Sequence, residues 1–175
     1  MSYQVIDNFL KYRDFEQLKN SIIDNNEFSW FMNNEVTSSE DVEETLSYQE
    51  KNWNWYFTHT FYLQIPYSTY FNQISDVFAK EFDKLDTFKT WIRIKANLYP
   101  HTEEVKEHQK HHDYPFTHKA AVFSLNTCNG FTRMPDGTKI DSVENRIIIF
   151  DGNEYHNSST TSDSKQRVNI NFNWF

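Results

Sequence analysis

The sequence predicts an α+β fold, in which a helical N-terminal half supports a C-terminal antiparallel barrel or jelly roll. Apolar residues recur at helical spacing before residue 90 and alternate with period two after it. Turn sequences separate the later segments, as is typical of antiparallel sheets. Aromatic residues make up 18% of the 175 residues, so flat side chains should dominate the core. The length fits one domain, with helical support and an aromatic strand in residues 1–89 and the barrel in residues 90–175.

Two helices are predicted in the N-terminal half. Residues 11–24 carry apolar side chains at helical spacing, and so do residues 69–86, where Ser68 suits the N-cap position. The first apolar stripe is Tyr12, Phe15, Leu18 and Ile22, and the second is Phe71, Ile74, Phe78, Phe82 and Leu85. We expect these two stripes to pack against a sheet.

Two other segments lie between these helices. Residues 34–50 are polar and acidic, which is typical of a solvated loop and also fits a mobile lid. Residues 53–57 alternate aromatic and polar side chains, which predicts a strand. We expect residues 34–50, together with the loop at 101–110, to flank the entrance of a pocket in the barrel.

Four strands are predicted after residue 90, and in two of them one face is apolar while the other is polar. Ile92, Ile94, Ala96 and Leu98 alternate with Arg93, Lys95, Asn97 and Tyr99. Val168, Ile170, Phe172 and Trp174 alternate with Arg167, Asn169, Asn171 and Asn173. Residues 121–127 and 146–151 are the other candidates, and turns are expected at Asn129-Gly130, Pro135-Asp136-Gly137 and Asp151-Gly152. The apolar sets should face the core, and the polar sets should line a wet or ligand-filled interior.

A metal site is indicated by His111, Asp113 and His156. In an extended segment, residues i and i+2 project to the same side, so His111 and Asp113 point together while His112 points away. Two histidines and one carboxylate with open positions are the ligand set of non-haem Fe(II) oxygenases. A structural zinc site would use four ligands, usually with thiolates, and Cys128 is the single cysteine.

Each of these histidines also has a simpler interpretation. A His-x-Asp pattern in a histidine-rich stretch is often solvated, and His156 alone could be a surface residue. His108 with His112 would form an i,i+4 pair on a helix. Pro115 disfavours a helix just before it, so the extended reading ranks higher.

Arg167 belongs to the predicted interior face of the last strand. An unpaired buried guanidinium is costly, so an anion should accompany it. The alternative is an ordinary salt bridge to Glu144 or Asp163.

Composition excludes some classes of function. The net charge of −8 disfavours a broad nucleic-acid-binding surface, because phosphate contacts need clustered Lys and Arg. No secretory signal is read at the N-terminus, and the longest aliphatic run, Ile147 to Phe150, is too short to cross a bilayer. The lone Cys128, expected to be a free buried thiol, fits a reducing cytoplasm.

The motifs in combination resemble the 2-oxoglutarate/Fe(II)-dependent dioxygenase superfamily. His156 follows the His111-x-Asp113 motif by 43 residues, and Arg167 follows 11 residues later. The local text is similar to a small prolyl-hydroxylase-like branch of phages and marine bacteria: His-His-Asp-Tyr-Pro-Phe at 111–116, Ser-Leu-Asn-Thr-Cys-Asn-Gly-Phe-Thr at 124–132, Glu-Asn-Arg-Ile-Ile-Ile-Phe-Asp-Gly at 144–152 and Arg-Val-Asn-Ile-Asn-Phe at 167–172. The resemblance covers residues 90–175, and the opening Val5 to Leu10 is similar but less specific.

The resemblance implies a double-stranded β-helix with iron at one mouth. It implies that the Fe(II) ligands are His111, Asp113 and His156, and that Arg167 pairs with the distal carboxylate of 2-oxoglutarate. Many members have Ser two residues after the Arg, where Asn169 stands here and can still donate a hydrogen bond. Tyr99 and Asn97 are the further cosubstrate candidates, and Arg93 and Tyr114 are candidate substrate contacts.

The implied reaction uses O2 and oxidatively decarboxylates 2-oxoglutarate to succinate and CO2 while a substrate is hydroxylated. That substrate would be a peptidyl side chain such as proline, a free amino acid or another small molecule. The implied setting is the cytoplasm, that of the host cell if the protein is phage-encoded. The alternative is a non-oxidative cupin-like isomerase or sensor, which needs a metal but not Arg167 at the matched spacing. A catalytically silent binding module ranks lowest, because all three ligands and the Arg are present.

Overall fold

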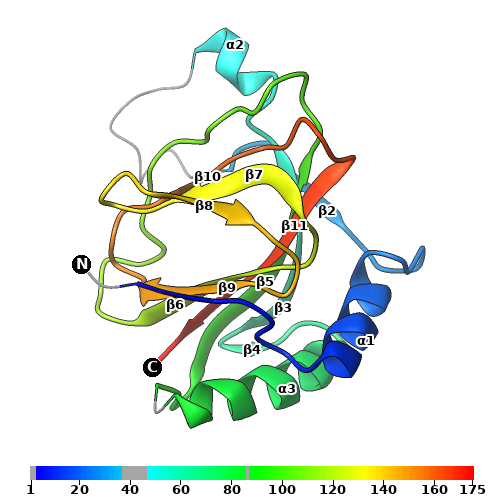
Figure 1. Ribbon diagram of the computed structural model, residues 1–175, viewed down its shortest axis with the longest axis vertical. Coiled ribbons are helices and arrows are strands. Elements are labelled where there is room, and N and C mark those ends of the chain that lie inside the picture. Colours follow the sequence, from blue (N-terminus) through cyan, green and yellow to red (C-terminus); the bar gives the residue numbers. More distant parts are fainter. Residues whose placement is uncertain (1–2, 37–46, 86) are drawn as a thin grey trace.

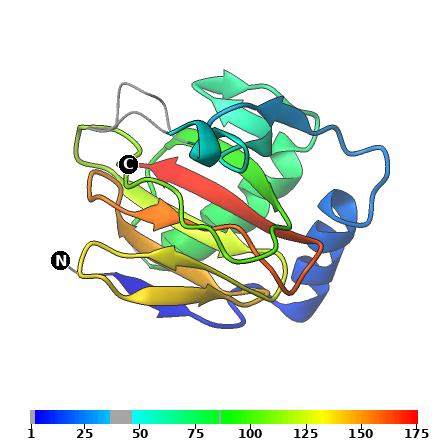
Figure 2. The same ribbon diagram turned by 90° about the horizontal axis from the view of Figure 1, so that it is seen from above.

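Two antiparallel sheets face each other in the computed structural model, which describes residues 3–36, 47–85 and 87–175. The strands are β1 Gln4–Ile6, β2 Phe31–Asn33, β3 Tyr56–Leu63, β4 Ile65–Pro66, β5 Trp91–Pro100, β6 Lys119–Ser124, β7 Cys128–Arg133, β8 Lys139–Ser142, β9 Ile147–Asp151, β10 Asn157–Ser158 and β11 Gln166–Trp174. The larger sheet has the order β1-β9-β6-β11-β5-β3-β2, with β4 beside β3, and the smaller has the order β10-β7-β8. Figures 1 and 2 show β7 and β8, in yellow, across from β6 and β9. The predicted α+β jelly-roll architecture is confirmed.

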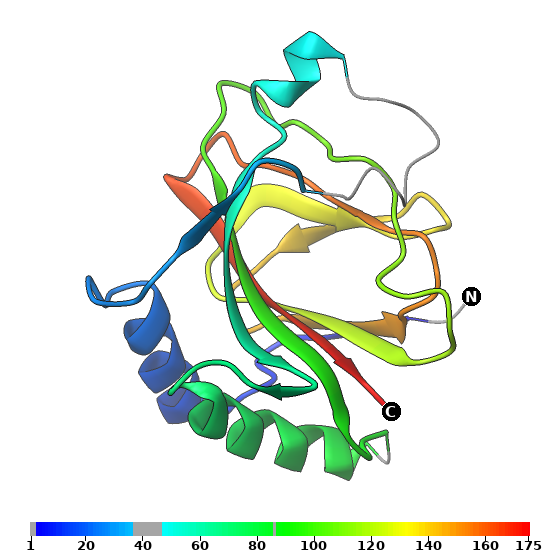
Figure 3. The ribbon, with the colours of Figure 1, turned by 180° about the vertical axis from the view of Figure 1, so that it is seen from behind.

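Two long helices cover the outer face of the larger sheet. They are α1 (Tyr12–Ile22) and α3 (Phe71–Lys84), and a single short turn of helix, α2 (Tyr48–Lys51), precedes β3. Figure 3 shows α1 and α3 on the side of the larger sheet that faces away from the smaller one. Their buried residues join one apolar core with the outer face of β11: Phe15, Leu18, Ile22, Ile74, Phe78, Phe82, Val168, Ile170, Phe172 and Trp174. The middle of each predicted stripe is therefore a packing surface, whereas Tyr12 and Leu85, at the ends of the stripes, are exposed.

The face of the larger sheet that packs on the helices is apolar. Its other face, toward the barrel interior, is apolar in one part and polar in another. A second small core fills one end of the barrel between the two sheets: Ala120, Val122, Met134, Ile140, Ile148 and Phe150. The interior faces of β5 and β11 carry polar side chains instead, and Asn97, Arg167, Asn169 and Asn173 are all buried there. The barrel interior thus has an apolar end, which closes it, and a polar end, which can hold a ligand.

Three local predictions were wrong. Ser68 does not cap α3, whose N-cap is Tyr70; the Ser68 hydroxyl instead accepts from the Tyr70 N–H at 3.2 Å and contacts the His59 ring. The aromatic strand begins at Tyr56, because backbone bonds from residues 53 and 54 back to Glu50 continue the turn after α2. Asn129-Gly130 lies inside β7 and not in a turn.

Most of the segment 34–50 lies outside the described residues, namely 37–46, so its interpretation as a loop or lid stays a prediction. The described part ends at Val36 and resumes at Ser47 just before α2. None of the described helices is long and apolar enough to span a bilayer.

Candidate metal and cosubstrate site

The structure brings His111, Asp113 and His156 together. One ligand atom from each lies within 4.8 Å of the other two. The backbones of His111 and His156 pair through two hydrogen bonds of 2.9 Å, each N–H donating to the other residue's carbonyl. Asp113 is fixed separately, by a 3.1 Å bond from its N–H to the Gly152 carbonyl. Backbone pairing therefore holds the His111 loop against the segment after β9.

Both imidazoles are oriented by backbone carbonyls. His111 Nδ1 lies 3.3 Å from the Gln109 oxygen, and His156 Nδ1 lies 3.1 Å from the Glu154 oxygen. Donation from Nδ1 selects the tautomer with the lone pair on Nε2, which is the usual arrangement for a metal-binding histidine. Burial, and then the charge of His156, lower the pKa of His111 to about 4, so this ring is neutral at physiological pH.

Each oxygen of the Asp113 carboxylate accepts a hydrogen bond from a different side chain. Arg93 Nη2 donates to one oxygen at 2.6 Å, and Asn173 Nδ2 donates to the other at 2.7 Å. Burial alone would raise the pKa of Asp113, but Arg93, the two histidines and Asn173 together hold it below its usual range. The Tyr114 ring lies 5.2 Å from the Arg93 guanidinium carbon. The two candidate substrate contacts, Arg93 and Tyr114, thus lie beside Asp113, and a role toward substrate stays a prediction for both.

Four pairs of facing residues on β5 and β11 form the floor of the interior, and we call them the polar ladder. Their register is Arg93 with Asn173, Lys95 with Asn171, Asn97 with Asn169 and Tyr99 with Arg167. Directly opposite residues in antiparallel strands bring their side chains together on one face. The ladder therefore connects the Asp113 carboxylate, at its first pair, to the Arg167 guanidinium, at its last.

Arg167 is buried without a counter-ion among the described residues. It is 1% exposed, and its guanidinium lies 5.5 Å from the centre of the Tyr99 ring. Nη1 donates to the Ser159 carbonyl at 3.0 Å and Nη2 to the Thr132 hydroxyl at 2.9 Å, while Nε has no partner. Burial lowers the pKa of Arg167 from its ordinary value, which reflects the cost of a charge in this place.

The alternative salt bridges of Arg167 are not formed. Glu144 pairs with Lys19 at 2.8 Å. The Asp163 carboxylate accepts hydrogen bonds from the Asn129 N–H and the Thr161 hydroxyl, at 2.9 and 3.0 Å. The guanidinium therefore has no anionic partner among the described residues.

The other cosubstrate candidates lie between the two ends of the ladder. Asn97 Nδ2 donates to Asn169 Oδ1 at 3.0 Å, and Asn97 Oδ1 is buried without a partner. Burial raises the pKa of Tyr99 to about 12, so the phenol keeps its proton and can act as a donor. The His108 ring packs on Tyr99 with its Nδ1 at 2.8 Å from Ser158 Oγ, which places His108 in the support of this residue and outside the metal triad.

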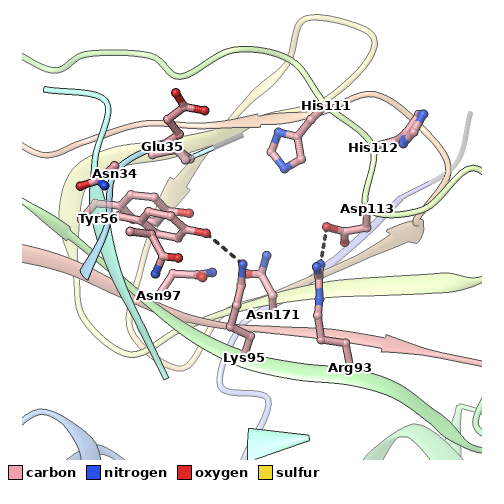
Figure 4. Close-up of a pocket in the computed structure, with 13 residues that line it drawn as sticks. Asn34, Glu35, Tyr56, Arg93, Lys95, Asn97, His111, His112, Asp113 and Asn171 are labelled. Atoms are coloured by element: carbon pink, nitrogen blue, oxygen red, sulfur yellow. Dashed lines mark hydrogen bonds and ion pairs between the residues drawn. The ribbon is translucent and has the colours of Figure 1, made fainter. Parts of the chain in front are cut away.

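A cavity of about 640 Å³ opens over the ladder. Its lining includes His111 and Asp113 on one side and Asn97 and Lys95 on the other (Figure 4), and Tyr99 is also a lining residue. The figure shows the His112 ring directed to the other side of the backbone from the His111 ring, as strand parity predicted, although His112 is also one of the lining residues. Asn33 to Val36 lie at the rim, whereas none of the described residues 101–110 is part of the lining. Arg167, Asn169, His156 and Tyr114 lie around the cavity without lining it.

Several supporting residues were missed in the sequence. Thr132 and Ser159 hold the guanidinium, and Asn173 holds both Asp113 and, at 3.1 Å, His118 Nε2. Asn173 carried a usable signal, because its parity with Arg167 places it on the interior face. Gly130 lies two residues before Thr132, so both face the same side of β7. This spacing could have indicated a role for Gly130, but the Asn129-Gly130 sequence predicts a turn instead.

Gly130 sets the position of Arg167, and we predict that Gly130→Ala disturbs it. A Cβ there would lie 2.6 Å from Arg167 Cδ and 2.6 Å from the Thr160 carbonyl oxygen. Overpacking of this kind should cost about 1–3 kcal/mol of unfolding free energy. Calorimetry should also show weaker 2-oxoglutarate binding. Gly137→Ala is the control: it strains a turn with φ of +88° but has open space around the Cβ, so it should lower stability and leave that affinity unchanged. Equal 2-oxoglutarate affinities in the two variants would contradict the prediction.

Comparison with known proteins places this geometry in context. No family model and no curated protein matches the sequence. Solved structures match over nearly its whole length. A 2-oxoglutarate/Fe(II) oxygenase family oxidoreductase from Burkholderia pseudomallei superposes with a TM-score of 0.69 at 9% identity, over 98% of this chain and 84% of that one. The chain has the fold of the 2-oxoglutarate/Fe(II) oxygenases.

Two prolyl hydroxylases share this oxygenase fold with the chain. The viral collagen prolyl hydroxylase of Paramecium bursaria Chlorella virus-1, solved as a 2-oxoglutarate complex, has a TM-score of 0.59 at 14% identity, over 100% of this chain and 97% of that one. A prolyl hydroxylase from Trichoplax adhaerens, in complex with a peptide of a hypoxia-inducible factor degradation domain, gives 0.62 at 12% identity, over 98% and 83%. At such identities the likeness establishes the fold, and the chemistry has to be argued from the site.

The residues of this oxygenase fold fit the groups that such proteins hold. The neutral His111 imidazole, the His156 imidazole and the Asp113 carboxylate suit Fe(II), and they form the candidate ligand set among the described residues. The buried Arg167, with an unpartnered Nε and no carboxylate of its own among the described residues, suits the distal carboxylate of 2-oxoglutarate. The metal site, at one end of the polar ladder, and Arg167, at the other end, thus suit the two ends of a metal-bound 2-oxoglutarate.

Proposed function

We propose that the protein is a 2-oxoglutarate- and Fe(II)-dependent oxygenase that hydroxylates a substrate. One observation carries the proposal: Arg167 is a buried guanidinium without a carboxylate partner among the described residues, on the same ladder that holds the Asp113 ligand. A metal triad alone would fit many proteins. A triad that shares its interior with an uncompensated cation calls for an anionic ligand that reaches from one to the other.

Each residue of the site has a defined task in this proposal. His111, Asp113 and His156 hold Fe(II), and Arg93 with Asn173 fix the Asp113 carboxylate in place. Arg167 binds the distal carboxylate of 2-oxoglutarate, and the protonated Tyr99 phenol donates to the same ligand. When bound, iron and 2-oxoglutarate supply the oxidising chemistry, in which O2 is consumed and succinate and CO2 are released. The surrounding protein orients these groups and limits access of water.

The substrate class of the proposed oxygenase is a protein, a peptide or a small molecule. A peptide is supported by the T. adhaerens structure, in which that prolyl hydroxylase is in complex with a peptide. A nucleic acid is disfavoured by the net charge of −8. The buried, unpaired Cys128 supports a reducing compartment such as the cytoplasm of a bacterial or phage-infected cell.

Anaerobic titration of 2-oxoglutarate into the Fe(II) protein tests the proposal. We expect a visible metal-to-ligand charge-transfer band, because chelation of iron by the keto acid produces one, followed by succinate release when O2 is admitted. A non-oxidative cupin-like isomerase or sensor would bind iron and show neither. Iron binding without the band would therefore favour that second candidate and reject the first.

A further inference from the structure

The second pair of the polar ladder, Lys95 with Asn171, has no task in the site described so far. Lys95 lines the cavity, and its Nζ donates to the Tyr56 hydroxyl at 3.1 Å. Among the described residues it forms no ion pair. Figure 4 shows the Lys95 ammonium rising from β5 beside the Asn171 amide, below the space that His111 faces. An ammonium has three donors, and the phenol takes one of them.

The other three pairs of the ladder are already engaged. Arg93 and Asn173 hold Asp113. Asn97 and Asn169 are bonded to each other. Tyr99 and Arg167 form the end assigned to the distal carboxylate. Asn171 lines the cavity and forms no bond to its ladder partner, and its buried Oδ1, like that of Asn97, has no hydrogen-bond partner. Lys95 and Asn171 are thus neighbouring polar groups that face the cavity with bonding capacity left over.

The charge around this pair favours an anion. Burial, and then the Arg93 guanidinium, lower the pKa of the Lys95 amine to about 7, while Asp113 opposes the shift. Asp113 is bonded to Arg93 and assigned to the metal, so it does not neutralise Lys95 as well. Glu35 is the acidic residue at the rim, and Figure 4 shows its carboxylate directed away from the ammonium. A carboxylate brought in by a ligand would supply the missing charge.

We propose that Lys95 and Asn171 form a second carboxylate site, which receives a carboxylate of the substrate. The inference rests on the proposed function, in which both carboxylates of 2-oxoglutarate are engaged, one at the metal and one at Arg167. The Lys95 ammonium donates to one oxygen of the third carboxylate, and Asn171 Nδ2 donates to the other. A carboxylate only accepts hydrogen bonds, so Asn171 Oδ1 takes no part in this contact. The substrate class is then a small organic acid or free amino acid, with its acid group close to the carbon that is oxidised, and not an internal residue of a neutral peptide.

The test measures carboxylate binding in a complex that cannot turn over. Protein labelled with ¹³C at the lysine Cε is loaded with Zn(II) and saturating 2-oxoglutarate, and is titrated with acetate, propionate and benzoate and with the three corresponding amides. The Lys95 resonance is identified by its loss in Lys95→Met. We expect the acids to shift this resonance and the amides to leave it in place. Acid binding to Lys95→Met, which lacks this resonance, is read from broadening of the acids' own resonances. It should be weaker by about tenfold or more, as expected for loss of a hydrogen bond to a charged group.

Lys139→Met is the matched control, because Lys139 is an exposed lysine of β8 over the Phe131 ring. It should bind the acids as the parent does. The inference is overturned if no acid shifts the Lys95 resonance, or if acids and amides act alike. It is also overturned if Lys95→Met weakens 2-oxoglutarate binding instead, because the carboxylate at Lys95 would then be that of the cosubstrate.

The same samples report on the proposed function separately. Binding of 2-oxoglutarate is read from its own resonances, so its failure to bind would reject the oxygenase assignment before any acid is added. In turnover assays with free L-amino acids and their α-amides, succinate release should favour the acids in the parent protein and lose that preference in Lys95→Met. Equal stimulation by acids and amides in the parent would sink the substrate assignment and leave the oxygenase assignment intact.

Discussion

Replacing Arg167 with methionine should remove 2-oxoglutarate binding almost entirely. In the parent protein the distal carboxylate gains a buried, charge-assisted partner, and the guanidinium gains the anion that it lacks among the described residues. Truncating one member of such a buried pair costs about 2–5 kcal/mol, so we expect the affinity to fall by roughly thirtyfold to several thousandfold. Calorimetry of the Zn(II) protein with 2-oxoglutarate measures it directly.

A second consequence of Arg167→Met separates a binding role from a structural one. In the ligand-free protein the guanidinium is a buried charge whose cost is reflected in its lowered pKa. Methionine removes that charge, so the unfolding free energy without ligand should change little, while the stabilisation by 2-oxoglutarate disappears. Arg146→Met removes a partly buried arginine that pairs with the exposed Asp7, and it should keep the 2-oxoglutarate affinity of the parent. A variant that still gains stability from 2-oxoglutarate would contradict the role of Arg167.

The polar ladder is the part of the site that the sequence predicts best. Strand parity depends only on the alternation of side chains across a sheet, so Arg93 to Tyr99 and Arg167 to Asn173 could be assigned to an interior face without tertiary information. The same parity separated His111 from His112. The register that pairs Tyr99 with Arg167 could not be obtained in this way, because it depends on how two strands distant in the chain align.

The local errors have a common physical origin. Ser68 is a good N-cap residue, but its hydroxyl is engaged by His59, and the first turn of α3 begins two residues later. Asn129-Gly130 is a strong turn signal, yet the glycine is needed because the buried Arg167 side chain passes within 2.6 Å of the place where a Cβ would stand. In both positions a contact with a distant residue overrides the local preference of the chain.

Asp113→Ala should abolish metal binding and also destabilise the metal-free protein. Loss of an outer-shell partner typically costs about 10–100-fold in metal affinity, and loss of a ligand should exceed that range. The stability effect comes from Arg93, whose side chain is 19% exposed and would keep its charge without the Asp113 carboxylate. Breaking a buried pair by removing one partner costs about 3–5 kcal/mol, and we expect the lower end here because Arg93 is partly exposed.

The double variant Arg93→Met/Asp113→Ala distinguishes these two effects. Removing the second charge leaves no uncompensated ion, so most of the lost unfolding free energy should return while metal affinity stays absent. Chemical denaturation and Fe(II) titration measure the two quantities independently. Asp151→Ala is the control, since its partner Lys119 is 43% exposed and such a surface pair contributes about 1 kcal/mol or less. If the double variant were no more stable than Asp113→Ala alone, the unpaired Arg93 charge would not be the source of the destabilisation. The ion pair between Arg93 and Asp113 would then serve only to orient the Asp113 carboxylate toward the metal.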